Sequence, residues 1–233
     1  MKKIISVILI SMLCCAFLFS CGNTEDTGKL YLVEQTMTDK TGTYTVKHYY
    51  NEQYQIVKQE NISSDESDTD SELRYDENGY WIYQKSVSKS GLVSEVFITN
   101  DANGRMTEQR MVNTYKGKET EIIITCEYTD EYGSYIQTST SGVTTTVTKD
   151  EHGNDIARSN NKGQSSTHEN KYNGDLLVET ITTMNVGTKT TITAMKYEYD
   201  SQGNKIKEIS YDTDGNVTYT QTYEYSSKVE FVK

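Results

Sequence analysis

A four-residue motif, Asp-x-x-Gly, recurs along this chain and limits the folds that the chain can adopt. It occurs at 76–79, 101–104, 130–133, 150–153, 200–203 and 212–215, and a shortened Tyr172-Asn173-Gly174 lies between the fourth and fifth copies. The aspartate can accept hydrogen bonds from backbone amides at the start of a type I turn, and the glycine can take the positive φ that returns the chain through a bulge. Each copy therefore predicts a tight turn between two antiparallel strands.

Glycines mark the chain at regular intervals beyond this motif. From Gly79 to Gly215 they are 9 to 16 residues apart, which fits one strand plus one turn. The glycines at 91, 117, 142, 163 and 187 are expected at turns on the opposite edge of the sheet. The pattern predicts a long antiparallel up-and-down meander of β-hairpins with about a dozen strands, preceded by a hairpin around Gly42. We expect a strongly curved open sheet or an incompletely closed barrel.

Composition supports an all-β fold. The chain holds 19 Tyr and no Pro, and Tyr and Thr favour pleated, half-buried surfaces. The run 217–225 alternates, with Val217, Tyr219, Tyr223 and Tyr225 on one face. Apolar residues make up only 34% of the chain, so one face of each strand can be covered, but not both.

The first twenty residues differ from the rest of the chain. A basic start is followed by an apolar stretch, 4–19, that is too short and wrongly flanked for a membrane-spanning helix. It leads into Leu18-Phe19-Ser20-Cys21, which resembles the lipobox of bacterial lipoproteins. The resemblance implies that residues 1–20 are a signal peptide and that Cys21 is acylated on its sulfur. An extracytoplasmic protein, lipid-anchored to the cell membrane, is then expected; an ordinary cleaved signal peptide is the alternative.

The remaining chain divides into a tether and one domain. Residues 21–29 are interpreted as the tether and residues 30–233 as the all-β meander. Within the domain, the acidic stretch 62–72 is predicted to be a mobile loop because it is polar and lacks aromatics. Asp68, Asp70 and Glu72 alternate there like calcium ligands, but no glycine makes the sharp turn that such a loop needs. A solvated charge run is the preferred interpretation.

Three of the turns begin with Tyr-Asp, at 75–76, 199–200 and 211–212. This pattern resembles the YD repeats of RHS-type bacterial surface and toxin-shell proteins, over roughly residues 73–225. The resemblance implies antiparallel hairpins outside the cytoplasm. It does not imply toxin delivery, because the chain is far too short to build an enclosing shell and shows no autoproteolytic segment.

The sequence offers no catalytic or metal-binding constellation. It has no nucleophile motif and no phosphate-binding glycine loop. His48, His152 and His168 lie far apart without metal-ligand spacing, and solvent-exposed positions are expected for them. Cys126 falls on the strand face of Ile122, Ile124 and Tyr128, which is typical of a small buried hydrophobe. We therefore expect no enzyme activity, no cofactor and no metal.

Charge narrows the possible partners. Residues 1–20 contain Lys2 and Lys3 and no acid, so their removal changes the net charge from -11 to -13. An acidic surface argues against nucleic acid and against further adhesion to anionic lipid. The membrane, through the N-terminal lipid, and an envelope glycan or protein remain as expected partners.

Four tyrosines form the candidate ligand-binding site. Tyr197 with Tyr199, and Tyr223 with Tyr225, place rings two residues apart on one strand face. Facing outward, they would form a platform for sugar rings or peptide; facing inward, they would support the sheet as cross-strand pairs, which is the preferred interpretation. The expected function is binding or structural at the cell envelope. The alternative is a carrier of lipid or another apolar ligand in a half-barrel, which would need a continuous aliphatic lining.

Overall fold

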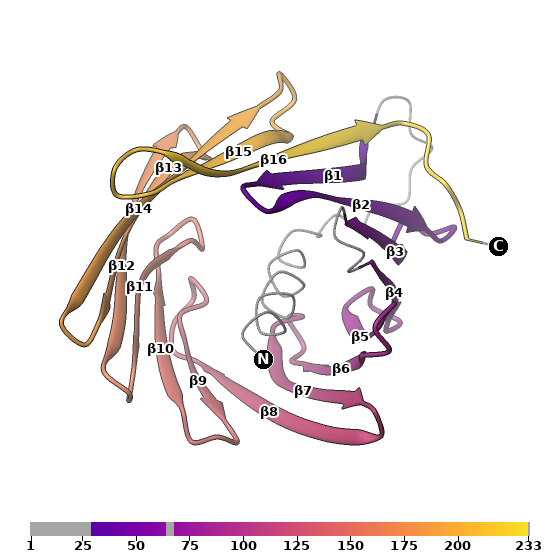
Figure 1. Ribbon diagram of the computed structural model, residues 1–233, viewed down its shortest axis with the longest axis horizontal. Helices are drawn as coiled ribbons and strands as arrows, with labels where there is room; N and C mark the ends of the chain where they lie inside the picture. Colours follow the sequence, from indigo (N-terminus) through magenta and orange to yellow (C-terminus); the bar gives the residue numbers. More distant parts are fainter. Residues whose placement is uncertain (1–28, 64–67, 233) are drawn as a thin grey trace.

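The computed structural model describes residues 29–63 and 68–232, and all of the regular elements in these ranges are strands (Figure 1). The sixteen strands are β1 (Tyr31–Asp39), β2 (Gly42–Tyr50), β3 (Ile56–Ser63), β4 (Thr69–Tyr75), β5 (Trp81–Ser88), β6 (Val93–Asn100), β7 (Met106–Tyr115), β8 (Lys118–Tyr128), β9 (Tyr135–Ser139), β10 (Thr144–Lys149), β11 (Asp155–Asn160), β12 (Gln164–Asn173), β13 (Leu176–Val186), β14 (Lys189–Tyr199), β15 (Lys205–Tyr211) and β16 (Val217–Ser226). The predicted signal peptide, Cys21 and most of the predicted tether lie outside the described residues.

The strands form a closed antiparallel barrel. Each strand pairs with the next along the chain, and β1 pairs with β16, with Gln35 opposite Tyr223. In Figure 1 the colours run once around the ring, and the yellow β16 lies against the indigo β1. The predicted all-β antiparallel meander is confirmed, and pairing of its two ends leaves the sheet no free edge.

The Asp-x-x-Gly motifs form the predicted turns. In the turn at 200–204, Asp200 Oδ1 accepts hydrogen bonds from the amides of Gln202 and Asn204, both at 2.9 Å. The Asn204 side chain and these amides hold the pKa of the Asp200 carboxyl below its usual range. Gly203 and Gly215 have φ of 83° and 81°, so the predicted positive φ is confirmed at both positions.

The turns lie on two rims. The rim where β1 begins and β16 ends, here called the terminal rim, also carries each turn that follows an even-numbered strand. Five of the six Asp-x-x-Gly turns are on the terminal rim, whereas the copy at 212–215 joins β15 to β16 on the opposite rim. Gly91, Gly117, Gly142, Gly163 and Gly187 lie on that opposite rim, as expected.

Tyrosines at the ends of even-numbered strands brace the terminal rim. Each hydroxyl donates to a carbonyl near the start of the preceding strand: Tyr50 to Leu32 (2.5 Å), Tyr75 to Ile56 (2.8 Å), Tyr128 to Met106 (3.2 Å), Tyr199 to Leu177 (2.7 Å) and Tyr225 to Lys205 (3.0 Å). Bulges interrupt several ladders next to this rim, including those at Arg74/Tyr75 and Glu198/Tyr199. The accepting carbonyls lie just outside the ladder with the strand that carries the tyrosine: Ile56 is two residues before Lys58, and Leu177 is two residues before Glu179, the first paired residues of those ladders. The tyrosine hydroxyls therefore supply donors beyond the ends of these ladders.

The acidic segment 62–72 is mostly strand, and its prediction as a loop is wrong. Ile62 and Ser63 end β3, and 69–72 begin β4; residues 64–67 lie outside the described ranges. In the strand register Glu72 lies directly opposite Lys58 and Lys85, so unlike charges alternate across these strands and favour their pairing. The preceding residue, Ser71, faces the inside of the barrel and is only 3% exposed.

The buried residues lie on the inner wall. In a closed barrel, alternate residues of each strand face inward, and cross-strand partners share a face. Two apolar clusters occupy this wall: Tyr50, Ile56 and Leu73 in one, and Val96, Ile98 and Met111 in the other. The outer wall carries the charged positions, such as the row Lys58, Glu72, Lys85 and Glu95 across β3–β6.

Candidate binding site on the inner wall of the barrel

The four predicted tyrosines lie on the inner wall. Tyr197 is directly opposite Glu208, which is 6% exposed, and Tyr223 is opposite Gln35, which is 7% exposed. Tyr199 and Tyr225 share the faces of their strand neighbours Tyr197 and Tyr223. All four rings are half-buried. They form no outward platform, but the fold does bring them together on β14 and β16, with β15 between.

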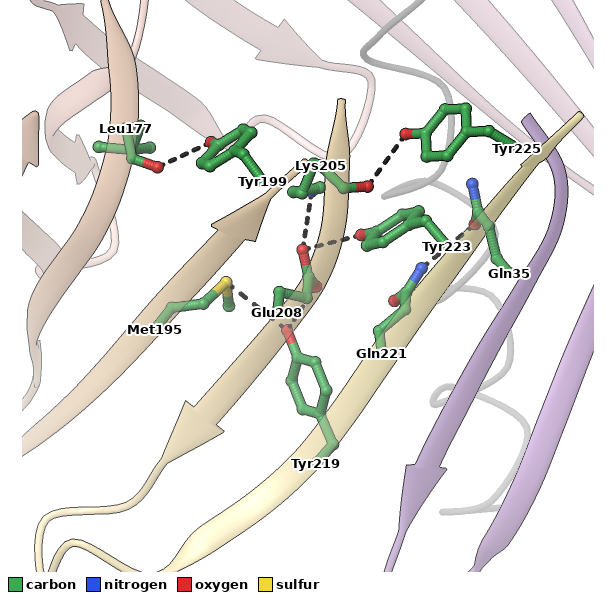
Figure 2. A network of polar contacts seen from close by, with 10 residues as sticks. All are labelled: Gln35, Leu177, Met195, Tyr199, Lys205, Glu208, Tyr219, Gln221, Tyr223 and Tyr225. Atoms are coloured by element: carbon green, nitrogen blue, oxygen red, sulfur yellow. Dashed lines mark hydrogen bonds and ion pairs between the residues drawn. The ribbon is translucent and has the colours of Figure 1, made fainter. Parts of the chain in front are cut away.

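Glu208 of β15 is the centre of a polar network among these rings (Figure 2). Its Oε2 accepts hydrogen bonds from Lys205 Nζ and from the Tyr223 hydroxyl, both at 2.8 Å. Its Oε1 accepts one from the Tyr219 hydroxyl at 3.2 Å. The sequence interpretation missed Glu208 and Lys205, because one carboxylate among 34 acidic residues carries no distinguishing signal.

The network presents polar groups and aromatic faces. Burial raises the pKa of the Tyr197 and Tyr219 hydroxyls. The Tyr219 and Tyr223 hydroxyls donate their hydrogens to Glu208, so their oxygen lone pairs remain as acceptors. Lys205 Nζ lies 4.6 Å from the ring centroid of Tyr223 and 5.5 Å from that of Tyr197. At this separation the ammonium is attracted to the ring faces. Such a surface suits a ligand with hydroxyl groups and a flat face for stacking.

A row of polar side chains continues from this network around the inner wall. Gln221 Nε2 donates to Gln35 Oε1 at 3.2 Å, which links β16 to β1. Further along, directly paired inward residues run from β2 to β7: His48, Gln59, Ser71, Ser86, Ser94 and Asn113. We call these six residues the polar row. His48 Nε2 and Asn113 Oδ1, at its two ends, are buried without a hydrogen-bond partner in the described part of the chain.

The expectation that His48 is solvent-exposed is wrong. It is 4% exposed, and burial lowers its pKa to about 4. Gln59 Nε2 donates to His48 Nδ1 at 3.3 Å, so the neutral ring carries its hydrogen on Nε2, where the partner is missing. A buried group of this kind calls for an explanation such as water or a ligand.

The other two histidines do not join His48. His152 stacks on Tyr172 with centroids 4.2 Å apart, and His168 lies between Ser166 and Thr182 at 3.1 and 3.0 Å. Residues 29–63 and 68–232 contain no cluster of three or more groups able to hold a metal. The same ranges contain no helix long and apolar enough to cross a bilayer.

A different sector of the inner wall is apolar. Val96, Ile98 and Met111 pack together on β6 and β7, and Val147 on β10 is 1% exposed. Cys126 is 9% exposed and burial raises the pKa of its thiol, which agrees with its predicted role as a buried hydrophobe. The inner wall therefore has an apolar sector formed by Val96, Ile98, Met111 and Val147, which on β6 and β7 adjoins Ser94 and Asn113 of the polar row.

The outer wall offers a weaker candidate. Arg74, Tyr83, Phe97 and Arg110 are consecutive cross-strand partners, with Tyr83 and Phe97 centroids 5.2 Å apart. Each arginine lies over the neighbouring ring, at 4.8 Å for Arg74 and 5.2 Å for Arg110. The arginines and rings interact with one another across the strands, so these contacts are explained by stabilisation of the sheet.

Comparisons with known proteins show the fold but no family. No family model matches the chain, and neither does any curated protein. A crystal structure of a porin-like protein from Bacteroides vulgatus matches with a TM-score of 0.55 and 12% identity, covering 86% of this chain and 100% of that one. A porin-like protein from Bacteroides uniformis matches with a TM-score of 0.50 and 12% identity, covering 84% and 98%. At such identity the likeness concerns the barrel architecture alone.

Proposed function

We propose that this protein is a lipid-anchored extracytoplasmic β-barrel that binds a neutral, hydroxyl-rich ligand, such as an envelope glycan, on its inner wall. The proposal assigns no catalytic step, no metal and no cofactor. The observation that carries it is the Glu208 network, in which Lys205 and the hydroxyls of Tyr219 and Tyr223 meet a buried carboxylate on one inward face.

The location rests on the sequence and on the outer wall. The lipobox-like Leu18-Phe19-Ser20-Cys21 supports acylation of Cys21. A barrel inserted in a bilayer needs an apolar band on its outer wall. Here that wall carries ion pairs such as Arg110–Glu121 and Lys207–Glu198, which supports a barrel held beside the membrane. The porin-like proteins that share the fold are consistent with an envelope setting.

The ligand class follows from the groups on the wall. Tyrosine hydroxyls, glutamine amides and serine hydroxyls exchange hydrogen bonds readily with a polyol, and tyrosine rings stack on the apolar face of a sugar. The unpartnered His48 Nε2 and Asn113 Oδ1 add one donor and one acceptor to the same wall. A ligand that spans both sites would reach from the Glu208 network to the polar row.

The apolar sector supports a second candidate, a carrier of lipid or another apolar ligand. Val96, Ile98, Met111 and Val147 would supply its contacts. The lining is not continuous, because the polar row crosses β2–β7 and Glu208 lies on β15. Direct comparison of a neutral oligosaccharide array with a fluorescent fatty acid separates the two: binding of the fatty acid alone would favour the carrier.

Replacing both Tyr223 and Tyr225 with alanine is expected to weaken oligosaccharide binding by at least about tenfold, since a loss of about 1.4 kcal/mol corresponds to tenfold. Binding is measured by titration with the best array ligand, and folding by thermal melting. The double phenylalanine variant is the matched control, because it keeps the rings and removes only the hydroxyls. Unchanged affinity in the alanine variant would contradict the assigned site.

Replacing Cys21 with alanine is expected to abolish fatty-acid labelling and to release the protein from the membrane fraction, because the acyl chains supply the anchor. Metabolic labelling and fractionation measure both effects. Cys126→Ala is the matched control and should change neither, since that thiol is buried in the barrel. Equal labelling of the Cys21 variant and the parent would refute lipid anchoring.

A further inference from the structure

One turn on the terminal rim places tyrosine where the others place glycine. In the turn at 51–55, the Tyr54 amide donates to the Asn51 carbonyl at 2.9 Å, and Asn51 Oδ1 accepts from the amides of Gln53 and Gln55 at 3.0 and 2.9 Å. The Asp76 turn has the same bonds, with Gly79 at the position of Tyr54. Tyr54 has φ of 59°, a left-handed conformation disfavoured for a residue with a Cβ.

The Tyr54 ring belongs to an exposed aromatic patch. It is 47% exposed and stacks on Tyr31 with centroids 4.7 Å apart and planes 16° apart. Phe231 meets it edge-on at 5.6 Å and is also 47% exposed. Lys29 Nζ lies 5.4 Å from the centroid of Tyr31. We call Tyr31, Tyr54 and Phe231 the rim patch.

The C-terminal tail fixes this patch in position. The Tyr50 amide donates to the Glu230 carbonyl at 2.8 Å, and the Val232 amide donates to the Tyr50 carbonyl at 2.9 Å. Tyr50 and Phe231 thereby form a parallel bridge outside the barrel ladders. Val232, the next residue, is 46% exposed. Two segments that are distant in sequence therefore hold apolar side chains toward solvent at one point of the rim.

The rim patch is also where the chain leads back toward Cys21. Nine residues separate Cys21 from Tyr31. Ten extended steps reach at most about 35 Å, so an acylated Cys21 keeps this rim close to the bilayer. Aromatic side chains are enriched at the membrane–water interface, and a lysine beside them can extend its ammonium to the headgroups.

We propose that the rim patch rests in the headgroup region of the membrane and orients the barrel with its terminal rim toward the bilayer; this rests on the proposed anchoring at Cys21. Glu52 and Glu230 flank the patch, so contact stays at headgroup depth. Glycine would relax the backbone at position 54 but would remove the ring that contacts the membrane, which explains why a disfavoured conformation is retained there.

Hydrogen exchange of the acylated full-length protein on phosphatidylcholine vesicles tests the proposal. Amides of 51–55 and 229–232 are expected to exchange severalfold more slowly than in Cys21→Ala protein in solution. The turn at Tyr115–Lys118, on the opposite rim, should exchange equally in both. Tyr54→Gly combined with Phe231→Ser should lose the added protection while remaining folded and acylated, because glycine relaxes the turn. Tyr115→Ser, which removes an exposed tyrosine from the opposite rim, should keep it.

The outcomes separate this inference from the anchoring on which it rests. Absence of acylation would overturn the anchoring. Acylated, vesicle-bound protein with no added protection at 51–55 would overturn the rim contact alone. Protection that appears in solution and grows with protein concentration would identify a second copy of the chain as the occupant, and would also overturn it.

Discussion

Replacing Glu208 with leucine is expected to lower the free energy of unfolding by about 3–5 kcal/mol, the range typical of removing one partner from a buried charge pair. Leucine removes the carboxylate that neutralises Lys205 and accepts hydrogen bonds from Tyr219 and Tyr223. Glu208 is 6% exposed, so water cannot easily take over these roles. Urea denaturation of the variant and the parent measures the difference.

The matched control is Glu198→Leu on the neighbouring strand. Glu198 faces the outer wall, its side chain is 55% exposed, and it lies 3.7 Å from Lys207. Exposed pairs of this kind contribute about 0–1 kcal/mol, so the control should lose little stability. The loss of stability for Glu208→Gln should lie between those of the two leucine variants, because glutamine has the same shape as glutamate and keeps one acceptor oxygen. Equal losses for Glu208→Leu and Glu198→Leu would refute a central role for Glu208.

Acidification is expected to destabilise the barrel through His48. Burial lowers the pKa of His48 from its ordinary value of 6.5 to about 4. The unfolded chain therefore binds the proton more readily than the folded protein does. The contribution of neutral His48 to the free energy of unfolding is fully present above pH 6.5. It is lost progressively as the pH falls toward the pKa of His48 in the folded protein. With about 1.36 kcal/mol per pKa unit, the loss between pH 7 and about pH 4.5 is on the order of 2–3 kcal/mol.

His48→Gln isolates this effect, because glutamine does not titrate and can still bond to Gln59. The difference in unfolding free energy between pH 7 and about pH 4.5 should shrink in the variant by most of the expected loss. Burial also lowers the pKa of His168, so a smaller dependence should remain. A variant as pH-sensitive as the parent would show that His48 is not buried in its neutral form.

Most of the fold could be predicted from short motifs in the sequence. Asp200 and Gly203 determine their own turn, since the aspartate accepts the amides and the glycine takes the positive φ without contacts from elsewhere. The end of β3 and the start of β4 were assigned to a loop because neither connection that flanks β3 has this motif. Asn51 replaces the aspartate and Tyr54 the glycine on one side, while the acidic residues 62–72 resemble a loop until Lys58 and Lys85 stand opposite Glu72.

The candidate site could be predicted only in part. Alternation placed Tyr223 and Tyr225 on one face, and this is a property of the strand itself. Which face looks inward depends on closure of the sheet, and closure depends on β1 meeting β16, a pairing without a local signal. Glu208 gained its role from three partners on β15 and β16 and from burial, none of which a single position in the sequence reveals.

The pairing of β1 with β16 also sets an order of assembly. Every other pairing joins strands adjacent in sequence, whereas Gln35 and Gln221 are 186 residues apart. Local hairpins form quickly, while a contact of such separation must wait for loop closure. Until the last strand has emerged and folded, β1 presents an unpaired edge to any other strand nearby. A chain that stops before residue 217 would therefore form its hairpins and still be prone to aggregation at both open ends.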